Sequence, residues 1–253
     1  MIPRLIVPLA GMPRTGSTFL FNCLLDILDS SKVGTFMNLG YLDLYRIETV
    51  NRIQTNDWEQ RYQHMFDQQS ENYNKHVIFK TCNLTLSIFT NLQSIGNVKP
   101  IFAIRNIEEV VKSIIGLYAN YQTENQQIVH DVEIFLQLSL RSLCDIHENV
   151  MIVTYNELMD QQLDEMRKIL DYLDIDVSDQ TIRVICDKFS RENVSTYLNN
   201  LDTVENDPIR LWHRMHLTRK HEIQQQDVST VLDYLKDDIN RVADIAGIDL
   251  WNI

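Results

Sequence analysis

The sequence predicts an α/β protein with a P-loop-type central parallel sheet, helices on both faces of the sheet and a largely helical C-terminal part. Two observations predict this fold class. Short apolar runs alternate along the chain with longer segments whose apolar residues recur at helical spacing. A glycine-containing loop also follows the first apolar run directly and opens the first helical segment. For a chain of 253 residues we expect a single domain with insertions, covering 1–253.

The elements follow in order. Residues 5–10 suit a buried strand, and residues 20–28 then carry apolar side chains at helical spacing, with Gly34 as a stop. Residues 41–75, which contain no glycine or proline, predict a helical insertion outside the sheet. Further strands are expected at 77–80, 100–104 and 150–153, and further helices at 84–95, 107–118, 132–146 and 157–173. The helical C-terminal part, about 178–253, has helices at 180–189 and 228–246 joined by a polar linker.

Composition limits the possible partners. A net charge of -12 argues against a broad surface for nucleic acid or for an anionic membrane, because both need a basic face. The four cysteines, at 23, 82, 144 and 186, lack paired metal-ligand spacing, which favours reduced thiols and a cytoplasmic location. The N-terminal apolar run is too short to span a bilayer, so no membrane span is expected.

The loop has most of the features of a phosphate-binding P-loop. Gly11 and Gly16 are separated by four residues and are followed by Ser17 and Thr18, so backbone N–H groups and a helix N-terminus can face an anion. The lysine that usually follows the second glycine is Ser17 here, and the cation of the loop is Arg14. That replacement argues against an ordinary nucleotide triphosphatase, which uses the lysine and magnesium at a transferable phosphate.

Three cations are expected at one edge of the sheet. Ligands of α/β sheets bind beyond the carboxyl ends of the strands, and this rule brings together Arg14, Lys80 and Arg105. Ser113 lies eight residues after Arg105, on the second turn of the following helix. A guanidinium and a hydroxyl in this arrangement form a clamp suited to a second phosphate.

These motifs resemble those of the sulfotransferase family, which uses 3′-phosphoadenosine-5′-phosphosulfate. The loop at 13–18 is similar to the family's phosphosulfate loop in the arginine form of its tyrosylprotein branch, and 102–106 with Ser113 resembles the motif for the 3′-phosphate. Residues 153–158 resemble the strand and turn that follow in the family, and Lys80 with Thr81 matches the strand end that carries a lysine in the cytosolic branch. The resemblance runs from about residue 5 to about residue 173.

The resemblance implies transfer of a sulfuryl group to a hydroxyl or amine of a small molecule or glycan, leaving adenosine 3′,5′-bisphosphate, with no metal required. It assigns Lys80 and Arg14 to catalysis and Arg105 and Ser113 to the 3′-phosphate. The donor's 5′ end is assigned to the loop residues Arg14, Thr15, Gly16, Ser17 and Thr18. Arg219 and Lys220 are similar to a basic pair that contacts the 3′-phosphate, although the glycine expected next is His221.

One residue departs from the family pattern, and it leaves the identity of the catalytic base open. Cys82 stands where cytosolic sulfotransferases have their histidine base, and a thiol is mostly protonated at neutral pH. Asp43, Glu48 and His64 are other candidates for the base, and no motif supports any of them. A non-catalytic nucleotide-binding relative therefore remains as an alternative. A P-loop small-molecule kinase is a second alternative, which the absent lysine and the arginine at position 105 disfavour. The acceptor and the oligomeric state do not follow from the sequence.

Overall fold

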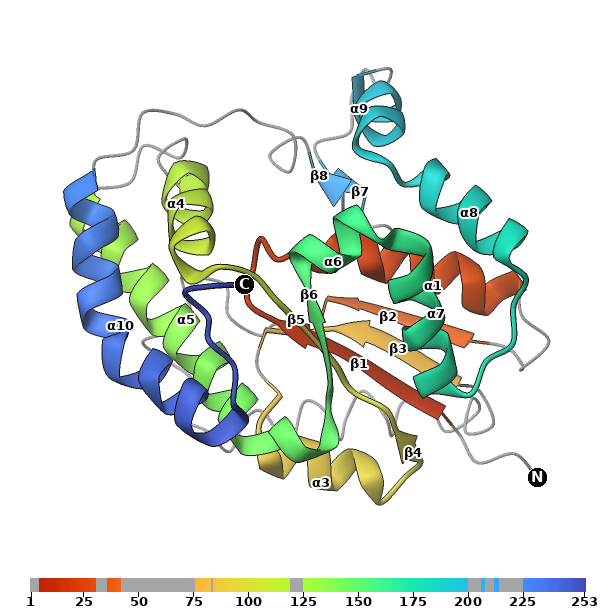
Figure 1. Cartoon of the computed structure of the whole chain (residues 1–253), viewed down its shortest axis with the longest axis horizontal. Helices are drawn as coiled ribbons and strands as arrows, with labels where there is room; N and C mark the ends of the chain where they lie inside the picture. Colours follow the sequence, from red (N-terminus) through yellow and green to blue (C-terminus); the bar gives the residue numbers. More distant parts are fainter. Residues whose placement is uncertain are drawn as a thin grey trace.

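The fold is an open parallel sheet between helical layers. It is seen in a computed structural model that describes residues 5–30, 36–41, 76–82, 84–118, 125–199, 206–207, 212–213 and 225–253. The strand order is β2-β3-β1-β5-β6, with β4 also beside β1, and every one of these pairs is parallel (Figure 1). The predicted fold class is confirmed.

The strands of the main sheet are short and mostly buried. They are β1 (Leu5–Gly11), β2 (Phe36–Tyr41), β3 (His76–Lys80), β4 (Asn97–Val98), β5 (Ile101–Ile104) and β6 (Met151–Thr154). A separate antiparallel pair is formed by β7 (Asn206–Asp207) and β8 (Trp212–His213). Because β1 lies between β3 and β5, the residues that follow these three strands meet at one edge of the sheet.

Helices follow most strands. They are α1 (Ser17–Ser30), α3 (Leu86–Gln93), α4 (Ile107–Tyr118), α5 (Asn125–Ile146), α6 (Tyr155–Asp160), α7 (Gln162–Leu173), α8 (Asp179–Lys188), α9 (Arg191–Asn199) and α10 (Gln225–Ala246), with a 3₁₀ turn at His147–Asn149. Side-chain hydroxyls cap several of them, among which Thr85 caps α3, Thr154 caps α6 and Ser178 caps α8. In the described part of the chain, no helix is long and apolar enough to cross a membrane.

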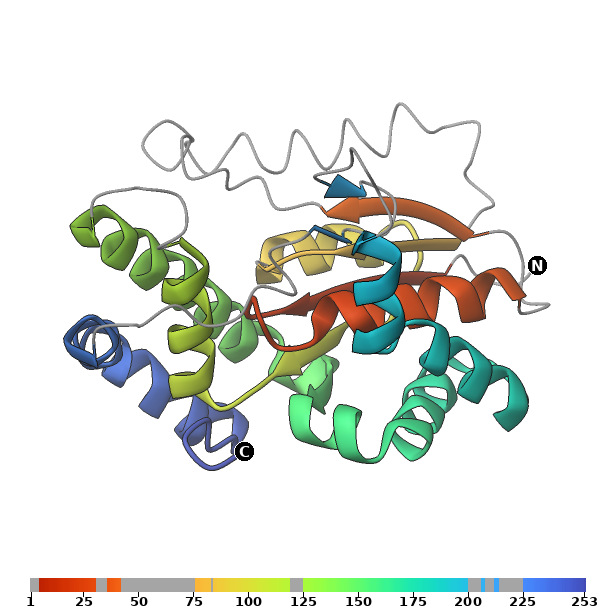
Figure 2. The ribbon, with the colours of Figure 1, turned by 90° about the horizontal axis from the view of Figure 1, so that it is seen from above.

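Helices cover both faces of the sheet (Figure 2). Alternate residues of β1, β3 and β5 belong to opposite cores. In β1, Ile6 and Ala10 belong to the core under α3, α4, α5 and α10, whereas Leu5, Val7 and Leu9 belong to the core under α1, α7 and α8. The central strands read as continuous apolar runs because both faces of the sheet are covered.

Pro8 occupies a central strand without costing a ladder hydrogen bond. Backbone groups alternate between the two sides of a strand, and the carbonyl of Ile6 accepts from Lys99 N at 2.9 Å on the side of β4 and β5. Pro8 faces that same side, at the point where the neighbour of β1 changes from β4 to β5. The missing N–H therefore falls in a gap of the ladder.

Several sequence predictions need correction. Four strands, β2, β4, β7 and β8, were not predicted, and three of these are only two residues long, which is too short to show a strand period. The helix α9 lies where a polar linker was expected, because polar residues dominate its sequence. The helix expected at 157–173 is divided into α6 and α7 at Gln161, whose φ of -126° and ψ of 44° are not helical. Apart from Tyr41, the last residue of β2, the insertion at 41–75 lies outside the described residues, and the division into domains stays a prediction.

Candidate active site

The loop between β1 and α1 has a backbone that only a few residue types adopt. Gly11 has a φ of +145°, and a Cβ there would lie 2.5 Å from the carbonyl oxygen of Ala103 on β5. Gly16 has a φ of +77°. Arg14 also lies in the left-handed region, with a φ of +66°, which is uncommon for a residue other than glycine. Such strain persists only where the surroundings hold it, and it concentrates at ligand sites.

Hydrogen bonds within the loop and the first turn of α1 stabilise the loop. The hydroxyl of Thr15 donates to the carbonyl of Met12 at 2.7 Å, and Leu20 N donates to the carbonyl of Gly16 at 3.1 Å. Both Thr15 and Ser17 are buried, and the first turn of α1 carries no acidic residue. The first turn of α1 therefore adds no negative charge to the N-terminus of this helix, which suits an anion at this position.

Lys80 joins the end of β3 to the start of α1. It pairs with Leu9 in the sheet, and its Nζ donates to the hydroxyl of Thr18 at 2.9 Å. Only 9% of Lys80 is exposed, which is unusual for a lysine. The structure therefore brings the predicted cation of β3 to the predicted loop.

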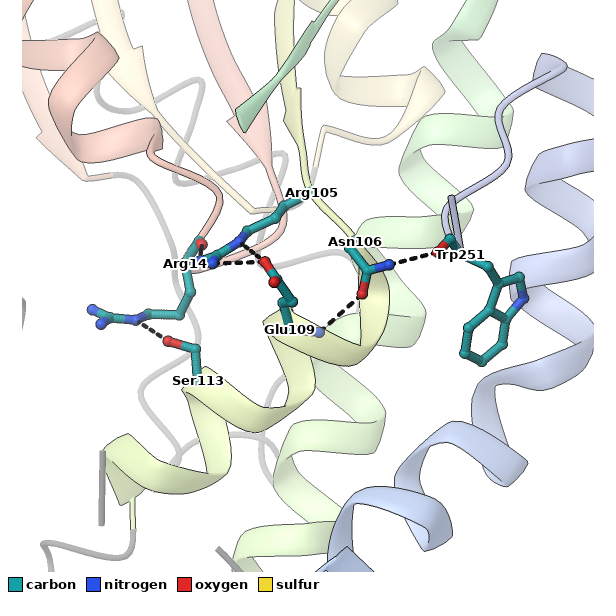
Figure 3. A network of polar contacts seen from close by, with 6 residues as sticks. All are labelled: Arg14, Arg105, Asn106, Glu109, Ser113 and Trp251. Atoms are coloured by element: carbon teal, nitrogen blue, oxygen red, sulfur yellow. Dashed lines mark hydrogen bonds and ion pairs between the residues drawn. The ribbon is translucent and has the colours of Figure 1, made fainter. Parts of the chain in front are cut away.

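Arg14 extends toward α4. Its Nε donates to the hydroxyl of Ser113 at 2.9 Å, and its carbonyl oxygen accepts from Nη1 of Arg105 at 3.3 Å. Figure 3 shows the two guanidinium groups on either side of the Arg14 backbone, with Ser113 beneath. Three residues predicted to share a site are thus in one network, although Arg14 and Ser113 are 99 positions apart.

Two residues without a predicted role hold Arg105. An oxygen of Glu109 accepts from Nε of Arg105 at 2.8 Å and lies 2.7 Å from its Nη2. The guanidinium also lies over the ring of Tyr155, 4.2 Å from its centroid. That ring packs on the loop as well, because a Cβ on Gly16 would lie 2.9 Å from Tyr155 Cδ2.

The sequence positions of Glu109 and Tyr155 indicate that both residues can contact Arg105. Glu109 stands four residues after Arg105, the spacing at which opposite charges meet near a helix start. Tyr155 directly follows β6, so the rule that placed Lys80 and Arg105 at strand ends applies to it too.

Cys82 lies just beyond β3 and is 2% exposed. Its carbonyl oxygen accepts from the hydroxyl of Ser139 on α5 at 2.9 Å, which ties the end of β3 to that helix. All four cysteines are free and buried. Cys82 thus has the environment of a small core residue.

Some of the predicted site residues lie outside the described residues. These are Arg219, Lys220 and the candidate bases Asp43, Glu48 and His64. Their roles stay predictions.

The side chains at this edge fit a ligand with two anionic groups. Lys80 and Thr18 form one bonded pair, and Arg14 forms a second group with Arg105 and Ser113. Cations and hydroxyls dominate this set, and Glu109 is engaged by Arg105. Such donors match phosphate and sulfate oxygens.

The comparisons agree with this chemistry. The family model of the sulfotransferase domain matches residues 6–244, and the chain therefore belongs to the sulfotransferase family. No curated protein matches the chain.

Solved structures share the fold at low sequence identity. Mouse sulfotransferase SULT7A1, complexed with PAP, is 17% identical with a TM-score of 0.60, over 97% of this chain and 86% of that chain. Retinol dehydratase in complex with androsterone and inactive cofactor PAP is 16% identical with a TM-score of 0.54, over 92% and 80%. A complex of retinol dehydratase with retinol and PAP is 16% identical with a TM-score of 0.52, over 94% and 82%.

Proposed function

We propose that the protein transfers a sulfuryl group from 3′-phosphoadenosine-5′-phosphosulfate to a hydroxyl or amine of a small-molecule or glycan acceptor. The family membership supports the reaction class, and the PAP complexes of the structural neighbours support the donor. The observation that carries the proposal is the network that joins Arg14, Arg105 and Ser113 at the carboxyl edge of the sheet.

The proposal gives each cation a task. Lys80 and Arg14, with the hydroxyl of Thr18, neutralise charge that develops on the donor's 5′-phosphate, while Arg105 and Ser113 hold its 3′-phosphate. The donor supplies an activated sulfuryl group. A bond from the acceptor oxygen or nitrogen to sulfur forms as the bond from sulfur to the bridging phosphate oxygen breaks, and that electron pair leaves with adenosine 3′,5′-bisphosphate. The acceptor proton passes to a base outside the described residues or to water.

A small hydroxyl compound is a reasonable first acceptor to test. Retinol dehydratase, whose fold this chain shares, is named with retinol and with androsterone, and both compounds carry a hydroxyl group. The four buried free thiols are consistent with a reducing compartment such as the cytoplasm.

The test is transfer of radiolabel from a donor carrying ³⁵S to pools of phenols, sterols, retinoids, sugars and amines. We expect label in at least one pool with the native protein and little with Arg105→Ala, which removes the clamp. If no pool takes label and the folded protein fails to bind adenosine 3′,5′-bisphosphate, the proposal is wrong.

A second function is favoured by one observation, which is Cys82 where cytosolic sulfotransferases have histidine. A buried thiol is a poor base, so the chain on this reading binds the nucleotide without turning it over. Firm binding of the bisphosphate without transfer to any pool would support this reading. A kinase is less consistent with the site, because Arg105 follows β5 where a carboxylate for magnesium is usual.

A further inference from the structure

The segment that follows α10 folds back onto the start of α4. Gly247, with a φ of +68°, turns the chain out of α10, and its N–H donates to the carbonyl of Ala243 at 3.0 Å. Leu250 is then fully buried in the core under α4 and α10. Figure 1 shows this segment ending beside the loop that leads into α4.

An internal turn gives the segment a defined shape. The carboxylate of Asp249 accepts from Trp251 N at 3.0 Å and from the side-chain amide of Asn252 at 2.7 Å. These hydrogen bonds hold the pKa of Asp249 below its usual value, with the Asn252 amide as the largest cause. The carbonyl groups of Leu250 and Trp251 are thereby presented to α4.

Two donors at the start of α4 bind these carbonyls. Ile107 N donates to the carbonyl of Leu250 at 2.9 Å, and the side-chain amide of Asn106 donates to the carbonyl of Trp251 at 2.5 Å. Asn106 also caps the helix, because its Oδ1 accepts from Glu109 N at 3.2 Å. One side chain therefore joins the segment to the first turn of α4.

The residues of the proposed 3′-phosphate clamp lie just before this turn and one turn after it. Arg105 directly precedes Asn106, and Glu109 and Ser113 lie one turn apart on α4. Glu109 holds the guanidinium of Arg105, and Ser113 bonds to Arg14 of the loop. Figure 3 shows the continuous path from Trp251 through Asn106 and Glu109 to Arg105 and Arg14.

We propose that residues 249–253 position the 3′-phosphate clamp, and that Asn106 is the positioning residue that transmits their placement to Arg105 and Glu109. The proposal rests on the proposed function, in which Arg105 and Ser113 bind the 3′-phosphate. It differs from simple packing, because loss of the contact changes recognition of one phosphate and not merely the melting temperature.

Two variants test it from opposite ends of the contact. Asn106→Ser keeps a capping oxygen at the start of α4 and removes the amide that reaches Trp251. Asp249→Ala removes two hydrogen bonds within the turn of the segment and changes no residue of α4 or of the clamp. Loss of the Asp249 charge alone favours anion binding, so weaker binding in this variant reports lost positioning.

Arg141→Ala is the matched control. It removes the ion pair of Arg141 with Asp238, 3.3 Å, which joins α5 to α10 at a distance from the segment. The measurement is the dissociation constant of each folded protein for adenosine 3′,5′-bisphosphate and for AMP, by titration calorimetry, with melting temperatures recorded alongside.

We expect the preference for the bisphosphate over AMP to fall about threefold to tenfold in Asn106→Ser and in Asp249→Ala, the range for one hydrogen bond. The preference should be unchanged in Arg141→Ala. If the native protein prefers the bisphosphate and both variants keep that preference, the positioning role is wrong and the proposed function stands. A native protein without the preference overturns the proposed function as well.

Discussion

Arg14 and Ser113 are joined by a hydrogen bond of 2.9 Å between the guanidinium Nε and the serine hydroxyl, so the phosphate loop and helix α4 share one polar contact. The sequence resemblance assigns Arg14 to the 5′ end of the donor and Ser113 to the 3′ end. On the proposed assignment the two halves of the donor site therefore adjoin, and a change at one half is expected to affect the other.

Ser113→Ala tests that connection. Loss of the hydroxyl removes one proposed ligand of the 3′-phosphate and one hydrogen-bond partner of Arg14. We expect affinity for adenosine 3′,5′-bisphosphate to fall about threefold to tenfold, as for one hydrogen bond. The control is Lys112→Ala, which changes the neighbouring residue, whose partner is Glu108. Equal losses in both variants, measured by calorimetry, would count against a specific role for Ser113.

Lys80→Ala tests stabilisation of the leaving phosphate. Lys80 is buried at the end of β3 and bonded to Thr18, so its charge is placed before the donor arrives. We expect turnover to fall about a hundredfold or more, the scale of one preorganised electrostatic donor, with a smaller effect on donor affinity. Lys99→Ala is the control, since Lys99 lies over the ring of Tyr172 near the opposite ends of the strands. Unchanged turnover in Lys80→Ala would remove this residue from the mechanism.

Cys82→Ala tests whether the thiol is the base. Because Cys82 is buried and a cysteine thiol is mostly protonated at neutral pH, we expect the variant to keep most of the activity. Cys82→His should raise turnover if the acceptor lies within reach of the ring. Steady-state rates with the best acceptor decide this. Abolished turnover in a folded Cys82→Ala protein that still binds the bisphosphate would show that the sulfur takes part.

The raised pKa of Glu133 predicts that the stability of the folded protein depends on pH. Burial raises the pKa of this carboxyl above its usual value, and His130, whose Nδ1 lies 3.8 Å away, partly offsets the rise. A raised pKa in the folded state means that the carboxyl's contribution to stability is present below its ordinary pKa and is lost as pH rises through the folded pKa.

Glu133→Gln removes this loss. The variant should gain melting temperature relative to the native protein on going from about pH 4 to about pH 7. Glu192→Gln, at an exposed position on α9, controls for the loss of a helix carboxylate. A relative gain that does not grow with pH would contradict the assigned cause.

The sequence predicted the parts of the site that depend on parallel-sheet topology. Lys80, the loop and Arg105 each follow an apolar run, and adjacent parallel strands bring such positions together. It did not predict which partners the side chains take. Tyr155 holds Arg105 and the loop through a ring contact, and Asn106 reaches a carbonyl 145 positions away. The strand-end rule places Tyr155 at this edge of the sheet. The contacts that its ring and the Asn106 amide make depend on how side chains and distant segments pack, and local patterns of residues do not encode those contacts.

The most direct measurement of the central claim compares nucleotides as stabilisers of the folded protein against heat. A charge-assisted contact contributes roughly 1.5–3 kcal/mol, and two such groups, Arg105 and Ser113, are assigned to the 3′-phosphate. Adenosine 3′,5′-bisphosphate at a hundredfold excess over its dissociation constant should stabilise the protein by about 2.7 kcal/mol. AMP at the same concentration should stabilise it far less, magnesium should change little, and Arg105→Ala should erase the difference. Better protection by ATP with magnesium than by the bisphosphate would contradict the sulfotransferase donor site and favour the kinase.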